Sequence, residues 1–191
     1  DIAICNIFEV NKDAHARFSA ISRSYEYIIS FKKNPLLFNR VYHLSKKLDI
    51  DQLNNASNIL FNHNDFRSFS KSKTDVKTFN CKILKAKWKL DGDLLIFSIK
   101  ANRFLRNMVR SIVGTMIEIG DGKIKFDKIK DIILSKDRSN AGYSAPAKGL
   151  SLINVEYTKE HLKQIKNQHQ MIHLYSMMSI LSPPHHHLLK L

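Results

Sequence analysis

The segment at residues 102–114 constrains the fold most, because it predicts a largely buried helix that follows directly on a strand. Apolar residues cover much of this helix, and three arginines recur at positions i, i+3 and i+7, so they would share one face. A guanidinium keeps its charge in a protein, so an arginine in apolar surroundings needs an anionic partner. The arginines are Arg103, Arg106 and Arg110, and we expect Arg110 to meet a carboxylate in a site.

The strand before this helix belongs to the clearest hairpin of the sequence. Its arms are predicted at residues 79–90 and 93–101, and Asp91-Gly92 is expected to supply the two positive φ angles of a type I′ turn. Asn102 is the predicted N-cap of the helix, and the glycines at 120 and 122 mark its end.

The remaining elements are predicted from periodicity and capping residues. Residues 22–30 alternate as a strand does and place Tyr25 and Tyr27 on its inward face. Asp49 is expected to cap a helix that ends near Asn62. The sequence also predicts a strand at 1–10, an irregular loop at 70–78, a helix at 127–134 and a strand at 150–157. Because a strand is predicted from the first residue, we expect the chain to begin within a fold.

The charge balance points to a polyanionic partner. Lysine and arginine number 31 against 17 acidic residues, a net charge of +14, and basic proteins gain affinity for nucleic acid by releasing counterions from phosphates. The alternative is that lysine is merely the default surface residue of this proteome.

No apolar run approaches the roughly 18 residues of a membrane span. Two isolated cysteines without a secretory leader favour the cytoplasm, and no metal site is expected.

Five segments together carry a family resemblance. They are His-Ala-Arg-Phe-Ser-Ala at 15–20, Ser-Tyr-Glu-Tyr at 24–27, Asp-Phe-Arg-Ser-Phe at 65–69, the arginine segment at 102–114 and Ala-Pro-Ala-Lys-Gly-Leu at 145–150. Their order and spacing resemble the C-terminal portion of the tRNA pseudouridine synthase A family over residues 1–157, approximately.

The resemblance implies a fold and an activity. The fold is α+β, an antiparallel sheet with helices on one face, and forms the second ferredoxin-like half of a pseudouridine synthase. The activity is a cofactor-free isomerisation of uridine to pseudouridine in the anticodon stem-loop of tRNA, in a protein that acts as a homodimer. Residues 1–158 would form the catalytic-fold domain, and residues 159–191 a tail that is helical at first and then disordered. The composition of this tail disfavours a metal site at its histidines, which include His185-His186-His187.

The resemblance also implies roles for individual residues. Arg110 matches the arginine that pairs with the catalytic aspartate, Tyr25 would stack on the extruded base, and Leu150 would lie beneath that base. Two alternatives stay open: Tyr25 and Tyr27 could be a core aromatic pair, and Arg110 could form an ion pair with Asp65 or Glu118. Further RNA contacts are expected from basic residues flanking the matched segments, namely Arg17, Arg23, Arg67, Lys71, Lys73, Arg103 and Arg106.

One family feature is missing from the sequence. The nucleophilic aspartate lies in a Gly-Arg-Thr-Asp segment upstream of everything matched, and the 191 residues contain no such segment. Asp75, which follows Lys73-Thr74, is interpreted as a solvated acid instead. The chain is therefore expected to be inactive alone. The alternatives are a non-catalytic RNA-binding module and a basic scaffold protein of a ribonucleoprotein.

Overall fold

The computed structural model describes residues 2–4, 7 and 9–158 of the chain. Residues Ala20–Tyr157 form one compact unit, and the residues before Ala20 belong to a second unit that is described by itself. The tail predicted at 159–191, with its helix and its histidines, lies outside the described residues.

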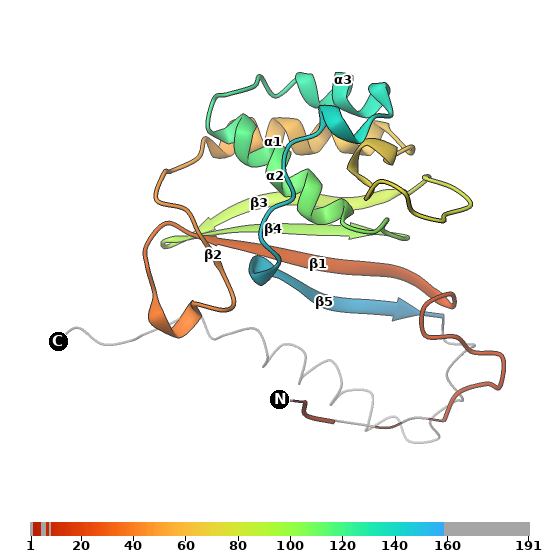
Figure 1. Ribbon diagram of the computed structural model, residues 1–191. Helices are drawn as coiled ribbons and strands as arrows, with labels where there is room; N and C mark the ends of the chain where they lie inside the picture. The colour runs from red at the N-terminus through yellow and green to blue at the C-terminus, as the bar shows by residue number, and fades with distance from the viewer. Residues whose placement is uncertain (1, 5–6, 8, 159–191) are drawn as a thin grey trace. The chain divides into compact units, whose positions relative to one another are not determined.

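A five-stranded sheet forms the base of the compact unit, with β1 (Ala20–Ser30) inside it. On one side β1 pairs antiparallel with β4 (Leu94–Ala101), which pairs antiparallel with the edge strand β3 (Ile83–Asp91). On its other side β1 pairs antiparallel with β5 (Leu150–Tyr157), and its last two residues pair in parallel with the short β2 (Tyr42–His43). Figure 1 shows this order.

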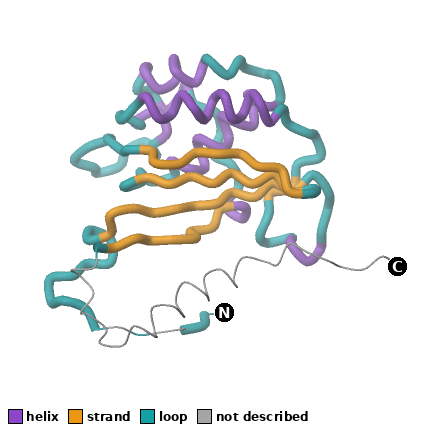
Figure 2. The backbone as a smooth tube through the Cα atoms, turned by 180° about the vertical axis from the view of Figure 1, so that it is seen from behind, coloured by secondary structure: helices purple, strands orange, loops and turns teal. Residues whose placement is uncertain are grey.

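Three helices cover one face of the sheet (Figures 1 and 2), which confirms the α+β fold. They are α1 (Ile50–Ile59), α2 (Met108–Gly120) and α3 (Lys128–Ser135). The predicted cap of α1 is confirmed, because the Asp49 carboxylate accepts hydrogen bonds from the backbone nitrogens of Asp51 and Gln52. Single turns of 3-10 helix link the elements: η1 (Pro35–Leu37), η2 (Leu60–Asn62), η3 (Arg67–Phe69), η4 (Arg138–Asn140) and η5 (Ala147–Gly149).

The core lies between the sheet and the helices. Trp88 of β3 and Phe97 of β4 are opposite each other in register and stack with ring centroids 4.6 Å apart. Tyr27 from β1 and Met108 and Ile112 from α2 are fully buried against the same cluster. The inward aromatic face predicted for residues 22–30 is therefore confirmed. Among the described residues, no helix combines the length and apolar character needed to cross a membrane.

The turn of the hairpin differs from the sequence prediction. Asp91 pairs with Leu94, so the two loop residues are Gly92 and Asp93 rather than Asp91 and Gly92. Gly92 has a φ of +56°, whereas Asp93 has no positive φ. This pattern fits glycine at the first central position of a type II′ turn, and the predicted type I′ turn is wrong.

The start of α2 was also predicted wrongly. The helix begins at Met108 after Asn107, whose φ of 68° is left-handed. Asn102 instead closes the end of the hairpin, where its Oδ1 accepts hydrogen bonds from the backbone nitrogens of Lys82 and Arg103 at 2.7 and 2.8 Å. Arg103 and Arg106 therefore precede the helix, and they do not share a helical face with Arg110.

The unit before Ala20 contains a closed turn at the first matched segment. The Nδ1 atom of His15 accepts hydrogen bonds from the backbone nitrogens of Arg17 and Phe18. The backbone carbonyl of His15 accepts a hydrogen bond from the Ser19 backbone nitrogen. In the strand predicted at 1–10, residues 2–4, 7 and 9 have no regular secondary structure, and residues 1, 5, 6 and 8 lie outside the described residues.

Candidate functional site

A cleft of about 770 Å³ opens beside the first turn of α2. Residues far apart in the sequence form its walls, because β1, the segment before α2 and the segment before β5 meet there. The lining carries four cationic side chains and no carboxylate; it consists of Tyr25, Lys71, Ser72, Phe104, Leu105, Arg106, Asn107, Met108, Val109, Arg110, Arg138, Ser144 and Leu150.

Tyr25 and Leu150 form one wall of this cleft. Leu150 pairs with Tyr27 across β1 and β5, so it lies on the same face of the sheet as Tyr25, two residues along β1. The half-buried ring of Tyr25 meets the ring of Phe104 edge-on, with centroids 5.2 Å apart. Phe104 also lines the cleft, and its edge-on contact helps to position the tyrosine ring.

Tyr27, in contrast, packs in the core and does not line the cleft. Its ring is fully buried, and its hydroxyl donates a hydrogen bond to the Pro146 carbonyl at 2.7 Å. Burial is the main cause that raises the pKa of Tyr27, so this phenol stays protonated. A Cβ at Gly149 would lie 2.8 Å from the Tyr27 ring, and only glycine therefore lets the start of β5 approach so closely.

Arg110 lies in the first turn of α2, half-buried in the cleft. Its Nε donates a hydrogen bond to the Ala145 carbonyl at 2.5 Å, and the Ala145 nitrogen donates one to the Arg110 carbonyl at 2.9 Å. No acidic side chain of the described residues forms an ion pair with it. Asp65 pairs with Lys136 instead, so the alternative of an ion pair from Arg110 to Asp65 or Glu118 is wrong.

The segment that carries Ala145 is packed directly on the backbone of α2. A Cβ at Gly114 would lie 1.7 Å from the Tyr143 carbonyl oxygen, which only glycine avoids. The Gly142 nitrogen donates a hydrogen bond to the Thr115 hydroxyl at 2.9 Å. These contacts place the Ala145 carbonyl against Arg110, so the guanidinium is oriented by the backbone.

A second polar cluster beside Arg110 was not found from the sequence. The Asn107 amide nitrogen donates a hydrogen bond to the Ser144 hydroxyl at 2.6 Å. Arg138 donates hydrogen bonds to the same hydroxyl at 3.2 Å and to the Ala141 carbonyl at 3.1 Å. All three side chains line the cleft. No periodicity or motif marks Arg138 and Ser144, which reach Asn107 only through the packing of the folded chain.

The RNA-binding candidates fall into different places. Arg106 and Lys71 line the cleft, and the Lys71 nitrogen donates a hydrogen bond to the Arg106 carbonyl. Arg67 and Lys73 line a smaller hollow next to it. Asp75 is exposed, as expected, and lines neither.

The other candidates are outside both hollows. Arg23 donates hydrogen bonds to the carbonyls of Ala20 and Asn102 at 2.8 Å, and Arg103 donates one to the Thr78 carbonyl. Arg17 belongs to the unit before Ala20, where its guanidinium lies 5.5 Å from the Phe18 ring centroid.

Comparison with known proteins identifies the family. A family model described as tRNA pseudouridine synthase matches residues 56–158. A protein of Parabacteroides distasonis named tRNA pseudouridine synthase A is 48% identical over 160 residues, which are 84% of this chain and 64% of that protein. Proteins of the same name from Bacteroides fragilis and Aliivibrio salmonicida are 47% and 40% identical over 84% of the chain, which covers 64% and 62% of their lengths. The chain thus spans less than two thirds of these relatives, and it belongs to the tRNA pseudouridine synthase family.

Proposed function

We propose that this chain supplies the base-binding and arginine side of the active site of a tRNA pseudouridine synthase. The observation that carries the proposal is the convergence of Tyr25, Arg110 and Leu150 on one cleft, although these residues lie far apart in the sequence. An aromatic face and an apolar side chain suit an extruded uracil, which must recover the stacking energy lost in the RNA.

Arg110 has the electrostatic role in this proposal. Its Nε is held by the Ala145 carbonyl, and no acid of the described residues uses the rest of its guanidinium fork. A carboxylate entering the cleft would find a preoriented cation and would be favoured in its ionised, nucleophilic form. We propose that this carboxylate is the aspartate of the family's Gly-Arg-Thr-Asp segment, which is not among the 191 residues. The chain alone is then inactive.

The reaction breaks the bond between ribose and the uracil nitrogen and joins the ribose to a uracil carbon. That carbon loses its hydrogen as a proton and the freed uracil nitrogen gains one, so no net proton is consumed; we propose that the Tyr25 hydroxyl, which lines the cleft, relays the proton from the carbon. No cofactor or metal enters this scheme. We further propose that the substrate uridines lie in the anticodon stem-loop and that the complete protein works in the cytoplasm as a homodimer.

The proposal is tested with a tRNA transcript whose uridines carry tritium on the carbon that becomes bonded to ribose. The chain is assayed alone and fused to the family segment that carries Gly-Arg-Thr-Asp. We expect tritium release only from the fusion, with loss of at least a thousandfold when the added aspartate becomes asparagine.

Two variants of Arg110 sharpen this assay. Arg110→Lys keeps the charge, but its single ammonium cannot replace the planar fork that serves both the Ala145 carbonyl and a carboxylate, so turnover should fall nearly as far as in Arg110→Ala. tRNA affinity should change little in either variant. A fusion that binds tRNA without isomerising uridine would refute the enzyme proposal in favour of a non-catalytic RNA-binding module.

A further inference from the structure

A second hollow of about 300 Å³ adjoins the cleft and shares Lys71, Ser72 and Arg138 with it. Five of its lining side chains are cationic and one is acidic. The lining consists of Arg67, Ser70, Lys71, Ser72, Lys73, Thr74, Phe79, Lys136, Asp137 and Arg138. Such an excess of one charge in a concave surface attracts anions more strongly than a flat surface does.

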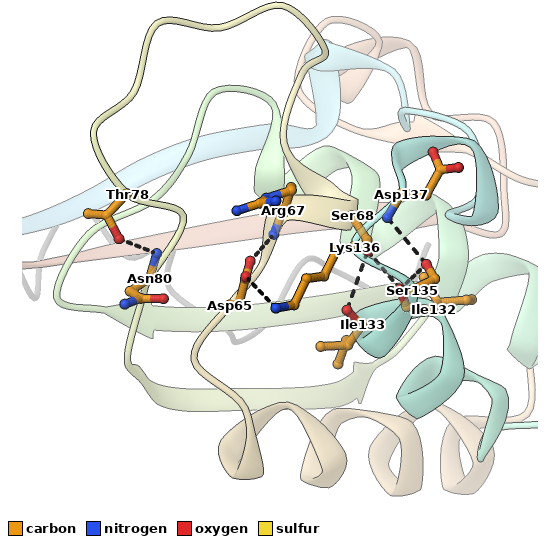
Figure 3. Close-up of polar contacts among 10 residues, drawn as sticks. All are labelled: Asp65, Arg67, Ser68, Thr78, Asn80, Ile132, Ile133, Ser135, Lys136 and Asp137. Carbon is orange, nitrogen blue, oxygen red and sulfur yellow. Dashed lines mark hydrogen bonds and ion pairs between the residues drawn. The ribbon is translucent and has the colours of Figure 1, made fainter.

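The acidic residues near this hollow are already engaged. The Asp137 carboxylate accepts a hydrogen bond from the Ser139 nitrogen at 2.8 Å, which lowers its pKa and keeps it turned to its own backbone. Asp65 accepts a hydrogen bond from the Arg67 nitrogen at 3.0 Å and lies 3.6 Å from the Lys136 ammonium (Figure 3). Among the described residues, Arg67, Lys71 and Lys73 have no acidic partner.

Two of the cations that line the hollow, Arg67 and Lys136, belong to elements that are joined by a buried hydrogen bond. Arg67 belongs to η3 and Lys136 follows the last turn of α3. The buried hydroxyl of Ser68 joins these two elements by donating a hydrogen bond to the Ile132 carbonyl at 2.7 Å (Figure 3). The Arg67 guanidinium lies 4.5 Å from the centroid of the Phe79 ring, a stacking that limits its rotation.

The backbone conformation also distinguishes the residues that line the two hollows. Lys73 and Lys136 have φ angles of 54° and 53°, in the left-handed region that costs most residues roughly 1 kcal/mol. With Asn107, they are the non-glycine residues of the described chain with positive φ, and all three line one of the two hollows. At Lys136 the left-handed residue is the C-cap of α3, a common helix end that fixes where the backbone enters the hollow.

We infer that this hollow binds a phosphodiester of the RNA next to the nucleotide whose base enters the cleft. The inference rests on the proposed function, because it takes the RNA in the cleft as given. Arg67 presents a planar, stacked fork and Lys136 a point charge, the combination that suits phosphate oxygens. Since both hollows share lining residues, one strand can serve both, with the base in the cleft and its neighbouring phosphate between Arg67 and Lys136.

The test measures tRNA affinity of the whole chain against salt concentration. The double variant Arg67→Ala/Lys136→Gly removes two charges and with them the Lys136–Asp65 ion pair and the Arg67–Phe79 contact, and glycine suits the left-handed backbone at 136. Lys85→Ala/Lys87→Ala is the matched control, because it removes two exposed charges from β3, outside both hollows. For the Arg67/Lys136 double variant we expect about tenfold weaker binding at low salt. The slope of the logarithm of the binding constant against the logarithm of the salt concentration should be shallower by about 0.7 to 0.9, as for one lost phosphate contact.

A second arm locates the phosphate. Each phosphodiester of a synthetic RNA hairpin containing the target uridine is replaced in turn by a neutral methylphosphonate. One replacement should weaken binding to the wild-type chain by the same factor and leave binding to the double variant unchanged. Equal losses in the Arg67/Lys136 and Lys85/Lys87 double variants, or a scan without a distinct position, would overturn the inference. Neither result depends on turnover, so the inference can fail while the isomerase proposal stands, and the reverse.

Discussion

Replacing Gly114 with alanine tests how the carbonyl that orients Arg110 is held. A Cβ there would lie 1.7 Å from the Tyr143 carbonyl oxygen and 2.8 Å from the Tyr143 carbonyl carbon. The segment that leads to Ala145 must therefore move by roughly 1 Å in a close-packed interior. Overpacking of this kind costs about 1–3 kcal/mol, and a backbone obstacle places it at the upper end. Alanine regains about 1 kcal/mol in helix propensity. We therefore expect a net loss of about 2 kcal/mol.

The assay is urea unfolding followed by far-ultraviolet circular dichroism, with Gly120→Ala as the control. Gly120 lies in the same helix, but a Cβ there would lie 3.0 Å from the Leu48 Cβ and the Leu53 Cδ2, so the neighbours need to move only by a few tenths of an ångström. Gly120→Ala should stay within about 1 kcal/mol of the wild-type free energy of unfolding. If both variants are equally stable, the segment at 142–145 does not pack on α2 as described, and the explanation of the Arg110 orientation fails.

Three further outcomes are expected. Tyr25→Phe keeps the edge-on contact with Phe104 but removes the hydroxyl, so the active fusion should lose turnover while tRNA affinity stays within about twofold. Burial raises the pKa of the Cys81 thiol from 9.0 to about 11 and also blocks access of the reagent, so in a Cys5→Ser variant alkylation near neutral pH should be at least about a hundredfold slower than after unfolding. This thiol's contribution to stability should be complete below pH 9 and lost as the pH rises towards 11. Leu152 of β5 is 53% exposed on a sheet edge, so sedimentation should show self-association that Leu152→Lys reduces.

Local patterns were sufficient for most of the fold. The strand at β1 followed from alternation and the helix α1 from its Asp49 cap, because both signals come from residues near in sequence. The prediction for the start of α2 failed because the partner of Asn102 is distant in the sequence. Asn102 has the residue type of an N-cap, but its side chain bonds to the Lys82 backbone across the hairpin, a partner that only the folded chain supplies.

The candidate site likewise contains residues that the sequence could indicate and residues that only the fold brings together. Tyr25, Arg110 and Leu150 were indicated by the family resemblance and do line one cleft, although their roles stay proposals. Arg138 and Ser144 lie in segments without periodicity, and their relation to Asn107 exists only in three dimensions. The sequence could indicate a net positive charge, but not that Lys136 and Arg67 line a common hollow.

The charge of the cleft leads to a last prediction. Arg110 is one of four cations in a lining without an acid, so its burial is offset only by the Ala145 carbonyl and by solvent in the open cleft. Arg110→Met would leave that carbonyl without its side-chain donor, a loss of about 1 kcal/mol, and would relieve a similar amount of repulsion and desolvation. The free energy of unfolding should therefore change by less than about 1 kcal/mol. A loss of about 3 kcal/mol or more, as when a buried ion pair is broken, would show that the guanidinium already has an anionic partner within the chain, and no place would remain for an incoming aspartate.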